Sequence, residues 1–390
     1  MDSVKLPVNL TWKLLARIFD DLSLESLCND LFKQAKCNPS NSYEIIYGLT
    51  LVLLKDTYPL CESSSDGITA NVQLYNLDKT IRFNTLANSE VYEKTMRYNW
   101  FCIEHAIFVK VLQICEANSS KSFIKSLYNY KLDIENNFQV RFDDYSLEQK
   151  ELYNFLKDQF DFDTFELTKY SLMRRNELLY RNLCILAYLV LGCDDINTSD
   201  RGSSLLDYSK LDCLLIQLYG VKEIWRNINN IKQLHGKKHY RFDREITSGV
   251  GGSLRPDAVY YFDNQPIQDI LVDVKLYASP CIENGVYKYR NNFNQVTTYA
   301  LAYASFIGSK EVNKSSRKDI NYTDVNAWIL HFRKNITNRE QGLNGKQLFD
   351  FSPVRVYNID LSEDRGIEYL DEQIKLFVNT YLVKESNELC

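Results

Sequence analysis

The sequence predicts a mixed fold class, α+β or α/β, in which a mainly helical N-terminal domain precedes a domain with a mixed central sheet flanked by helices. Two observations predict it. Apolar residues recur at spacings of three and four through most of the first half, whereas β-rich runs alternate with helical segments in the second half. The 390 residues are 45% hydrophobic and 25% charged, which is ordinary for a globular protein and enough for two domains.

The N-terminal domain is assigned to residues 1–203, and most of it is expected to be helical. Ser146, with Gln149 three positions later, forms a capping-box pattern at the start of one helix. Residues 68–86 alternate around the turn sequence NLDK, which predicts a β-hairpin. The polar segment 192–204 separates two apolar segments and is the expected linker. The expected helices span residues 12–34, 42–56, 101–128, 146–160 and 166–192.

The second domain, residues 204–390, reads as an α-β-β-β-α-β core with a mixed sheet flanked by helices. The run DILVDVKLY is apolar on both sides of its charged residues, so this strand is expected to be central. The expected helices span residues 212–231, 292–306 and 366–383, and the expected strands span 239–247, 254–262, 269–277, 326–333 and 353–361.

Two of these strands carry charged side chains where a sheet interior should be apolar. Asp257 lies in RPDAVYYF, and Asp273 and Lys275 lie in DILVDVKLY. Side chains alternate along a strand, so Asp273 and Lys275 share a face. A hairpin that turns symmetrically about Gln265 places Asp257 opposite Asp273, with Cβ atoms about 4.5–5.5 Å apart. Two carboxylates and an amine are therefore expected to converge on one spot.

This convergence favours a divalent-metal site. Two close carboxylates repel each other unless a cation lies between them, and Mg²⁺ prefers carboxylate oxygens and water. We expect Asp257, Asp273 and the main-chain carbonyl of Val274 to bind Mg²⁺, with Mn²⁺ as an alternative ion. Lys275 is expected to orient or deprotonate the attacking water, or to neutralise developing charge. The competing interpretation is a structural ion pair of Lys275 with Asp257 or Asp273 on a solvent-facing strand.

Further residues are candidates for the same site, each with a plain alternative as a core or solvated surface residue. Gln295 and Tyr299 lie at i and i+4 on a helix that follows the lysine strand, where they could contact a phosphate or the attacking water. Glu223 lies in an amphipathic helix before the sheet and could reach the metal. DNA contact needs local positive charge, and the chain is enriched in it just before the hairpin. The DNA-binding candidates are Lys237, Lys238, Arg241, Arg244 and Arg255.

The chain resembles the PD-(D/E)xK nuclease superfamily in motifs that occur in this order: Glu223, Arg255-Pro256-Asp257, Asp273-Val274-Lys275 and Gln295-x-x-x-Tyr299. The layout RPDAVYYF…ILVDVKLY…NQVTTYALAY is most similar to the McrC-like and LlaJI-like nuclease subunits of restriction systems, over residues 212–306. The segment LYGVKEIW, around Glu223, departs from the pattern of the family's glutamate helix.

The resemblance implies an Mg²⁺-dependent DNA endonuclease of an anti-phage restriction system, working with an AAA+ GTPase subunit of the McrB type. The implied catalytic residues are Asp257, Asp273, Lys275, Glu223, Gln295 and Tyr299. Residues 1–203 would then form an adaptor that docks on the partner or contacts DNA. The alternatives are a RecB-like exonuclease or other DNA-processing nuclease, and a non-catalytic DNA-binding scaffold. The intact set of Asp257, Asp273 and Lys275 argues against the scaffold.

Composition limits the other function classes. The net charge of −5 restricts any nucleic-acid contact to a local patch. The ten cysteines form no C-x-x-C pair, which argues against zinc, iron–sulfur clusters and a Cas4-type nuclease, and is typical of reduced thiols. The sequence contains no P-loop, so a nucleotide-hydrolysing motor would come from a partner. The longest apolar run, residues 183–192, is half of the roughly 20 residues that a membrane span needs. The N-terminus lacks a signal-peptide pattern, and we expect a cytoplasmic protein without a membrane partner.

Overall fold

The chain forms two compact units in the computed structural model. The helical unit is Phe19–Ile196, and the sheet unit combines Met1–Ile18 with Asn197–Cys390. The structure describes residues 5–20, 23–57, 73–76, 79–82, 103–138, 141–144, 148–161, 166–167, 177–194, 209–230, 237–240, 246–247, 253–254, 256–262, 270–277, 282–283, 286–287, 290–311, 325–342, 344–346, 353–361 and 366–387.

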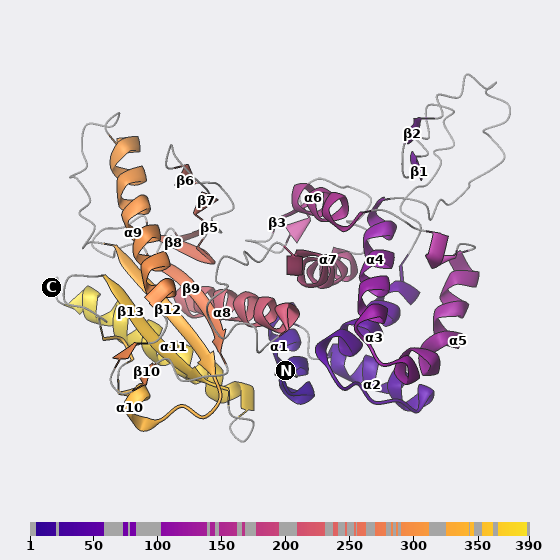
Figure 1. The fold of residues 1–390 in the computed structure, drawn as a ribbon, viewed down its shortest axis with the longest axis horizontal. Helices are drawn as coiled ribbons and strands as arrows, with labels where there is room; N and C mark the ends of the chain where they lie inside the picture. Colours follow the sequence, from indigo (N-terminus) through magenta and orange to yellow (C-terminus); the bar gives the residue numbers. More distant parts are fainter. Residues whose placement is uncertain are drawn as a thin grey trace. The chain divides into compact units, whose positions relative to one another are not determined.

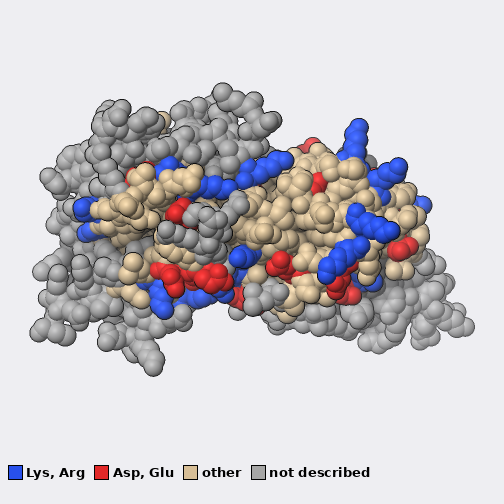
Figure 2. Space-filling view, turned by 90° about the horizontal axis from the view of Figure 1, so that it is seen from below, with Lys and Arg blue, Asp and Glu red and all other residues tan. Residues whose placement is uncertain are grey.

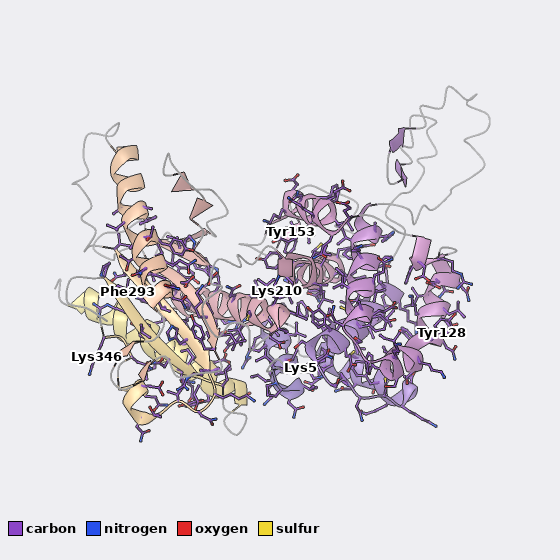
Figure 3. The ribbon with its side chains drawn as sticks, in the orientation of Figure 1. Lys5, Tyr128, Tyr153, Lys210, Phe293 and Lys346 are labelled. Atoms are coloured by element: carbon purple, nitrogen blue, oxygen red, sulfur yellow. The ribbon has the colours of Figure 1, made fainter. Side chains whose placement is uncertain are left out.

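The helical unit is organised around α3, which is buried along most of its length and packs against α2, α4, α5 and α7 (Figure 1). A helix that is apolar on nearly all sides has to be enclosed by others. Tyr153 of α6 stacks on Tyr188 of α7, with ring centroids 6.0 Å apart (Figure 3). The helices are α2 (Ser23–Ala35), α3 (Ser42–Lys55), α4 (Ile103–Ala117), α5 (Lys121–Phe138), α6 (Gln149–Gln159) and α7 (Glu177–Leu191). Short strands pair as β1 (Gln73–Asn76) with β2 (Lys79–Arg82) and as β3 (Phe160–Asp161) with β4 (Glu166–Leu167).

The hairpin β1–β2 confirms the strand pair expected within residues 68–86, but three expected helices differ. The segment 12–34 is divided between α1 (Val8–Phe19) and α2, because the chain turns at Asp20 with φ of 55°. This left-handed conformation is tolerated best by Gly, Asn and Asp and ends a helix. The expected helix 101–128 is likewise two helices, α4 and α5. The expected helix 166–192 begins only at α7, after β4.

The capping box expected at the start of α6 is wrong. The N-cap of α6 is Glu148, which makes no side-chain capping bond, and Ser146 lies outside the described residues. Gln149 instead donates from Nε2 to the Leu191 carbonyl, at 2.9 Å, near the end of α7. The Gln149 side chain, which the capping box would use, therefore makes a tertiary hydrogen bond.

The sheet unit contains a mixed five-stranded sheet in the order β13-β12-β9-β8-β5, as traced through the described residues (Figure 1). Strands β9, β12 and β13 are parallel, whereas β8 is antiparallel to both β9 and β5. The order of the main helices and strands expected for the second domain is found, but the expected strand 239–247 corresponds to both β5 and β6, and the expected strand 254–262 to both β7 and β8. Their bounds are α8 (Lys210–Asn230), β5 (Lys237–Tyr240), β8 (Ala258–Phe262), β9 (Ile270–Tyr277), α9 (Arg290–Glu311), β12 (Asn326–Arg333), α10 (Asn338–Gln341), β13 (Val354–Asp360) and α11 (Gly366–Asn387). Two small pairs accompany them, β6 (Ile246–Thr247) with β7 (Ser253–Leu254), and β10 (Ile282–Glu283) with β11 (Val286–Tyr287).

Helices cover both faces of this sheet. Helix α9 packs on β9, β12 and β13 (Figure 1). There Val296 and Tyr299 join a core cluster with Leu271 and Tyr277 of β9. Helix α8 approaches the other face of β9, and α11 packs on α8 and β13. A Cβ atom on Gly220 of α8 would lie 3.4 Å from the methyl groups of Val274. Alternation along β9 therefore directs the odd-numbered side chains, Asp273 and Lys275 among them, toward α9.

Helix α1 belongs to the sheet unit, although it was assigned to the first domain by position in the chain. The Leu6 amide donates to Asp212 Oδ2 of α8 at 3.2 Å, and Arg17 pairs with Asp371 of α11 at 2.8 Å. Lys222 and Arg226 of α8 donate to the carbonyls that end α1. Lysine and arginine side chains commonly satisfy such free carbonyls. The helical unit is therefore inserted between α1 and the rest of the sheet unit, and its second boundary, Ile196, falls in the expected linker segment.

Candidate active site

The candidate site lies where β8 and β9 separate, beyond the pair Ala258–Val272, and this place is called the fork below. The pairs Ala258–Val272, Val259–Leu271 and Tyr260–Ile270 follow the register predicted from the sequence. Pairing of β8 with β9 stops at Ala258–Val272, whereas β12 pairs with β9 through Tyr277. The Val274 amide donates instead to Oδ2 of Asp257, at 2.6 Å. A carboxylate thus occupies the place of the next backbone acceptor and satisfies a buried strand amide.

Asp273 and Lys275 lie beside this fork on the α9 face of β9. Their exposures are 1% and 8%, and Lys275 Nζ lies 3.1 Å from Asp273 Oδ2. Burying a charge is costly unless it is paired, and the pairing explains how β9 accommodates both side chains. The solvent-facing ion pair considered from the sequence is therefore wrong in its placement, because both groups are inside the protein.

Helix α9 places Tyr299 and Gln295 over the same spot. Burial raises the pKa of Tyr299, and the Asp273 carboxylate raises it further; Asp257 adds to the shift and Lys275 opposes it. Tyr299 therefore lies within the electrostatic reach of all three charged groups and stays protonated. Gln295 donates from Nε2 to Tyr299 Oη at 2.6 Å, which leaves the hydroxyl proton of Tyr299 free to bond another acceptor.

The start of α9 also holds amide groups with unused hydrogen-bonding capacity. Among the described atoms, Gln295 Oε1 and both amide atoms of Asn292 are buried without a partner. Asn292, Gln295 and Tyr299 fall at i, i+3 and i+7, which is one face of a helix. A buried polar group without a partner costs about 1–3 kcal/mol, so these groups are suited to bonding water or substrate.

His331 of β12 is a neighbour of Lys275 that the sequence did not reveal. The parallel register pairs the two residues. Burial lowers the pKa of His331 to about 3, with the charges of Lys275 and Arg333 contributing, so the imidazole is neutral at physiological pH. A histidine that is uncharged at neutral pH adds no further positive charge to a site already occupied by Lys275.

Helix α8 reaches the fork through Gln217. Its Nε2 donates to Asp257 Oδ1 at 3.2 Å. Cys213, one turn earlier, has a pKa raised to about 12 by burial and by Asp212, against the opposing charge of Lys275. Neither residue belonged to the predicted site, because their contact with β9 depends on how the helix is rotated against the sheet.

Glu223, the site residue expected from α8, is directed elsewhere. It pairs with Arg226 and accepts a bond from Asn227 at 3.1 Å, both on its own helix. Burial raises its pKa, Arg226 opposes the shift and Asp371 of α11 adds to it. The structure does not bring this glutamate together with Asp273, since Arg226 and Asn227 of α8 hold its carboxylate. Six residues of helix, about 9 Å of rise, separate it from Gln217.

The residues at the fork fit a hard divalent cation. In a strand the N–H and C=O of one residue point to the same side, so the Val274 carbonyl faces the gap that holds Asp257. Two carboxylates and one carbonyl are the oxygen ligands that Mg²⁺ uses, with water filling the other positions. Within the described part of the chain, no group of three or more His, Cys, Asp and Glu side chains gathers to hold a metal ion. The fork therefore offers a partial ligand set and no all-protein cage.

The predicted DNA-binding residues are only partly placed. Lys237 and Lys238 lie on β5, the edge strand next to β8, and β5 ends at Tyr240 opposite Val259. Their side chains, together with Arg241, Arg244 and Arg255, lie outside the described residues. On the face seen in Figure 2, described basic and acidic side chains are interspersed over the surface.

No protein-family model matches this sequence, and no curated protein matches it either. Among the described helices, none combines the length and the apolar character that crossing a membrane requires.

Proposed function

We propose that the sheet unit is a metal-dependent deoxyribonuclease of the PD-(D/E)xK type, with its active site at the fork between β8 and β9. One observation carries the proposal. Asp257 bonds the main chain of Val274 at 2.6 Å, between Asp273 and Lys275, which form a buried pair at 3.1 Å. Two carboxylates, a carbonyl and an ammonium group are thereby gathered on one short segment of β9, as phosphodiester hydrolysis with a divalent cation requires.

Each side chain has a distinct part in this chemistry. Mg²⁺ held by Asp257, Asp273 and the Val274 carbonyl would neutralise phosphate charge and make a bound water more acidic. Lys275 orients the attacking water and offsets the negative charge that grows as the water oxygen bonds phosphorus and the P–O ester bond breaks. The proton that the water loses passes to solvent, and the released ester oxygen takes a proton from solvent and leaves as a hydroxyl. Tyr299, protonated because its pKa is raised, donates a hydrogen bond to a phosphate oxygen and keeps its proton. Gln295 holds the Tyr299 hydroxyl in place through their 2.6 Å bond.

We further propose that the chain is the endonuclease subunit of a McrBC-like restriction system and acts in the cytoplasm with an AAA+ GTPase. Its support is the order of the motifs and the position of Lys237 and Lys238 on an edge strand next to β8. Because α1 belongs to the sheet unit, we assign docking on the partner or contact with DNA to the helical unit, Phe19–Ile196.

Cleavage of two DNA forms tests this proposal. The full chain, alone and with the AAA+ GTPase subunit, is incubated with supercoiled plasmid and with end-labelled linear DNA, with and without Mg²⁺. Nicking or linearisation of the plasmid identifies an endonuclease, whereas shortening of only the linear DNA identifies the RecB-like alternative. Asp257→Asn and Asp273→Asn should abolish cleavage, because each removes a negatively charged ligand.

Asp212→Asn is the matched control. Asp212 is a buried aspartate of the same unit that accepts a bond from the Leu6 amide, and an asparagine oxygen can still accept that bond. Mn²⁺ binding is followed in parallel by calorimetry. Absence of any Mn²⁺ binding that depends on Asp257 or Asp273 contradicts the proposal and leaves the buried Asp273–Lys275 pair as a structural feature of a scaffold.

A further inference from the structure

Helix α8 contacts the carboxylate hairpin through a neutral side chain. Gln217 Nε2 donates to Asp257 Oδ1 at 3.2 Å, while the Val274 amide donates to Asp257 Oδ2 at 2.6 Å. The two bonds come from different elements and hold different oxygens of one carboxylate. Rotation of this carboxylate about its last side-chain bond would break both, so its plane is fixed relative to β9.

The close approach of α8 to β9 makes this contact possible. Gly220 lies one turn after Gln217, and even a Cβ atom there would be in contact with Val274 and Phe332 at 3.4 Å. Cys213, one turn before Gln217, is close enough for its pKa to respond to Lys275. The face of α8 from Cys213 to Gly220 therefore runs directly past the fork, and Gln217 lies at its middle.

The chemistry of the donor fits a site that must keep its negative charge. A lysine or arginine at position 217 would neutralise Asp257, and a glutamate would place a third carboxylate beside it. An amide N–H orients the carboxylate and leaves its charge in place. A carboxylate has about four lone-pair positions, and the bonds from Gln217 and Val274 use two of them, one on each oxygen.

We propose that Gln217 is a positioning residue that fixes Asp257 in the orientation in which it binds a divalent cation. This inference rests on the proposed function, since it concerns the same metal site. Gln217, and not Glu223, is then the residue of α8 that acts at the site. Residues that hydrogen-bond a metal ligand typically change metal affinity or activity by about 10–100-fold when they are replaced.

Titration of the full chain with Mn²⁺ alone, followed by electron paramagnetic resonance, tests the inference without any cleavage assay. Gln217→Met keeps the length of the side chain and removes the donor, and we expect it to weaken Mn²⁺ binding by about 10–100-fold. Gln113→Met is the matched control, because Gln113 makes a comparable bond, 3.1 Å to the Phe142 carbonyl, in the helical unit. This control should bind Mn²⁺ like the wild type. In the DNA assay, higher Mg²⁺ should restore cleavage by Gln217→Met, because affinity is what the variant loses.

Gln217→His keeps an N–H donor at a similar reach and keeps the inference testable if Gln217→Met folds poorly. Mn²⁺ affinity near that of the wild type in Gln217→His supports the positioning role. Wild-type affinity in a folded Gln217→Met, or a loss in Gln217→His as large as in Gln217→Met, overturns it. Asp273→Asn separates this failure from failure of the proposed function. If Asp273→Asn weakens Mn²⁺ binding and the Gln217 variants do not, only the positioning role is wrong; if wild-type binding does not depend on Asp273, both are wrong.

Discussion

The helical unit and the sheet unit both bury charged side chains, but they satisfy them differently. In the helical unit, Glu44 accepts four bonds at 2.6–3.0 Å, from the amides and hydroxyls of Ser40 and Ser120. Lys131 pairs with Glu116 at 2.9 Å, and Tyr47 donates to the same oxygen at 2.8 Å. These groups tie α3, α4 and α5 together within the protein.

The sheet unit also buries two charged side chains, Asp273 and Lys275, at the place where two strands separate. Asp273 and Lys275 lie at the fork, and α9 sets Gln295 and Asn292, with their unused hydrogen-bonding capacity, on the face that carries Tyr299. Two kinds of buried charge can be distinguished in this way. Charges bonded on all sides by their own unit hold the fold together, whereas charges beside unsatisfied amides mark a place for a ligand.

A large stability effect is expected from Glu44→Ala. The substitution removes the buried carboxylate that accepts four bonds from Ser40 and Ser120, and a hydrogen bond to a charged group contributes about 1.5–3 kcal/mol to stability. We expect a loss of at least about 3 kcal/mol in the free energy of unfolding of the helical unit, measured by denaturant titration. DNA cleavage per folded molecule should not change. A loss below about 1 kcal/mol would show that water replaces the carboxylate easily.

Acid should destabilise the sheet unit through His331. The folded protein holds its pKa at about 3, against 6.5 for the free side chain. Between these values the unfolded chain binds a proton that the folded chain does not, so stability falls as pH falls, by up to about 1.4 kcal/mol per pH unit. This contribution vanishes above pH 6.5. His331→Phe should flatten the stability profile between pH 6.5 and 4.5, measured by thermal unfolding at each pH. Parallel profiles for the two proteins would argue against a buried neutral imidazole.

Smaller effects on stability, of opposite sign, are expected when Gly48 and Gly220 are replaced by alanine. A Cβ on Gly48 of α3 would lie 2.5 Å from the Phe32 ring, so Gly48→Ala should cost about 1–3 kcal/mol by overpacking. A Cβ on Gly220 of α8 would lie at contact distance, 3.4 Å, from Val274 and Phe332. Gly220→Ala should therefore be neutral or should stabilise by up to about 1 kcal/mol, the helix preference of alanine. Denaturant midpoints of the two variants check the order, and equal shifts would contradict it.

The sequence predicted the carboxylate hairpin well because its geometry is local. Alternation with a period of two fixes which strand residues share a face, and the short connection fixes the register, so Asp257 was correctly set against the Asp273 strand. The order of helices and strands in the sheet unit follows from hydrophobic periodicity for the same reason. Each of these features depends on residues close together in the chain.

The features that the sequence could not predict depend on packing between distant segments. Most of α8 is buried on all sides, so periodicity does not tell which of Gln217 and Glu223 faces the fork. Packing of Gly220 against Val274 decides it. The register that brings His331 beside Lys275 is set by a parallel crossover through α9. The assignment of α1 depends in the same way on contacts with α8 and α11.

A comparison of two buried lysines tests the central claim most directly. Lys275 pairs with Asp273 at 3.1 Å in the sheet unit, and Lys131 pairs with Glu116 at 2.9 Å in the helical unit; the lysine side chains are 9% and 11% exposed. Lys275→Met and Lys131→Met are assayed for DNA cleavage in Mg²⁺ and for thermal unfolding, on the same protein preparations. Removing one partner of a buried pair costs about 3–5 kcal/mol of stability, and less for Lys131 because Glu116 is 24% exposed, so both variants are measured at a temperature at which they remain folded.

We expect folded Lys275→Met to lose about 10²–10⁴-fold in cleavage rate while it still binds Mn²⁺ and DNA, because the carboxylates remain. Folded Lys131→Met should lose stability and cleave DNA at the wild-type rate. Cleavage at the wild-type rate by folded Lys275→Met would show that Lys275 is only a structural partner of Asp273, as Lys131 is of Glu116, and would rule out its catalytic role.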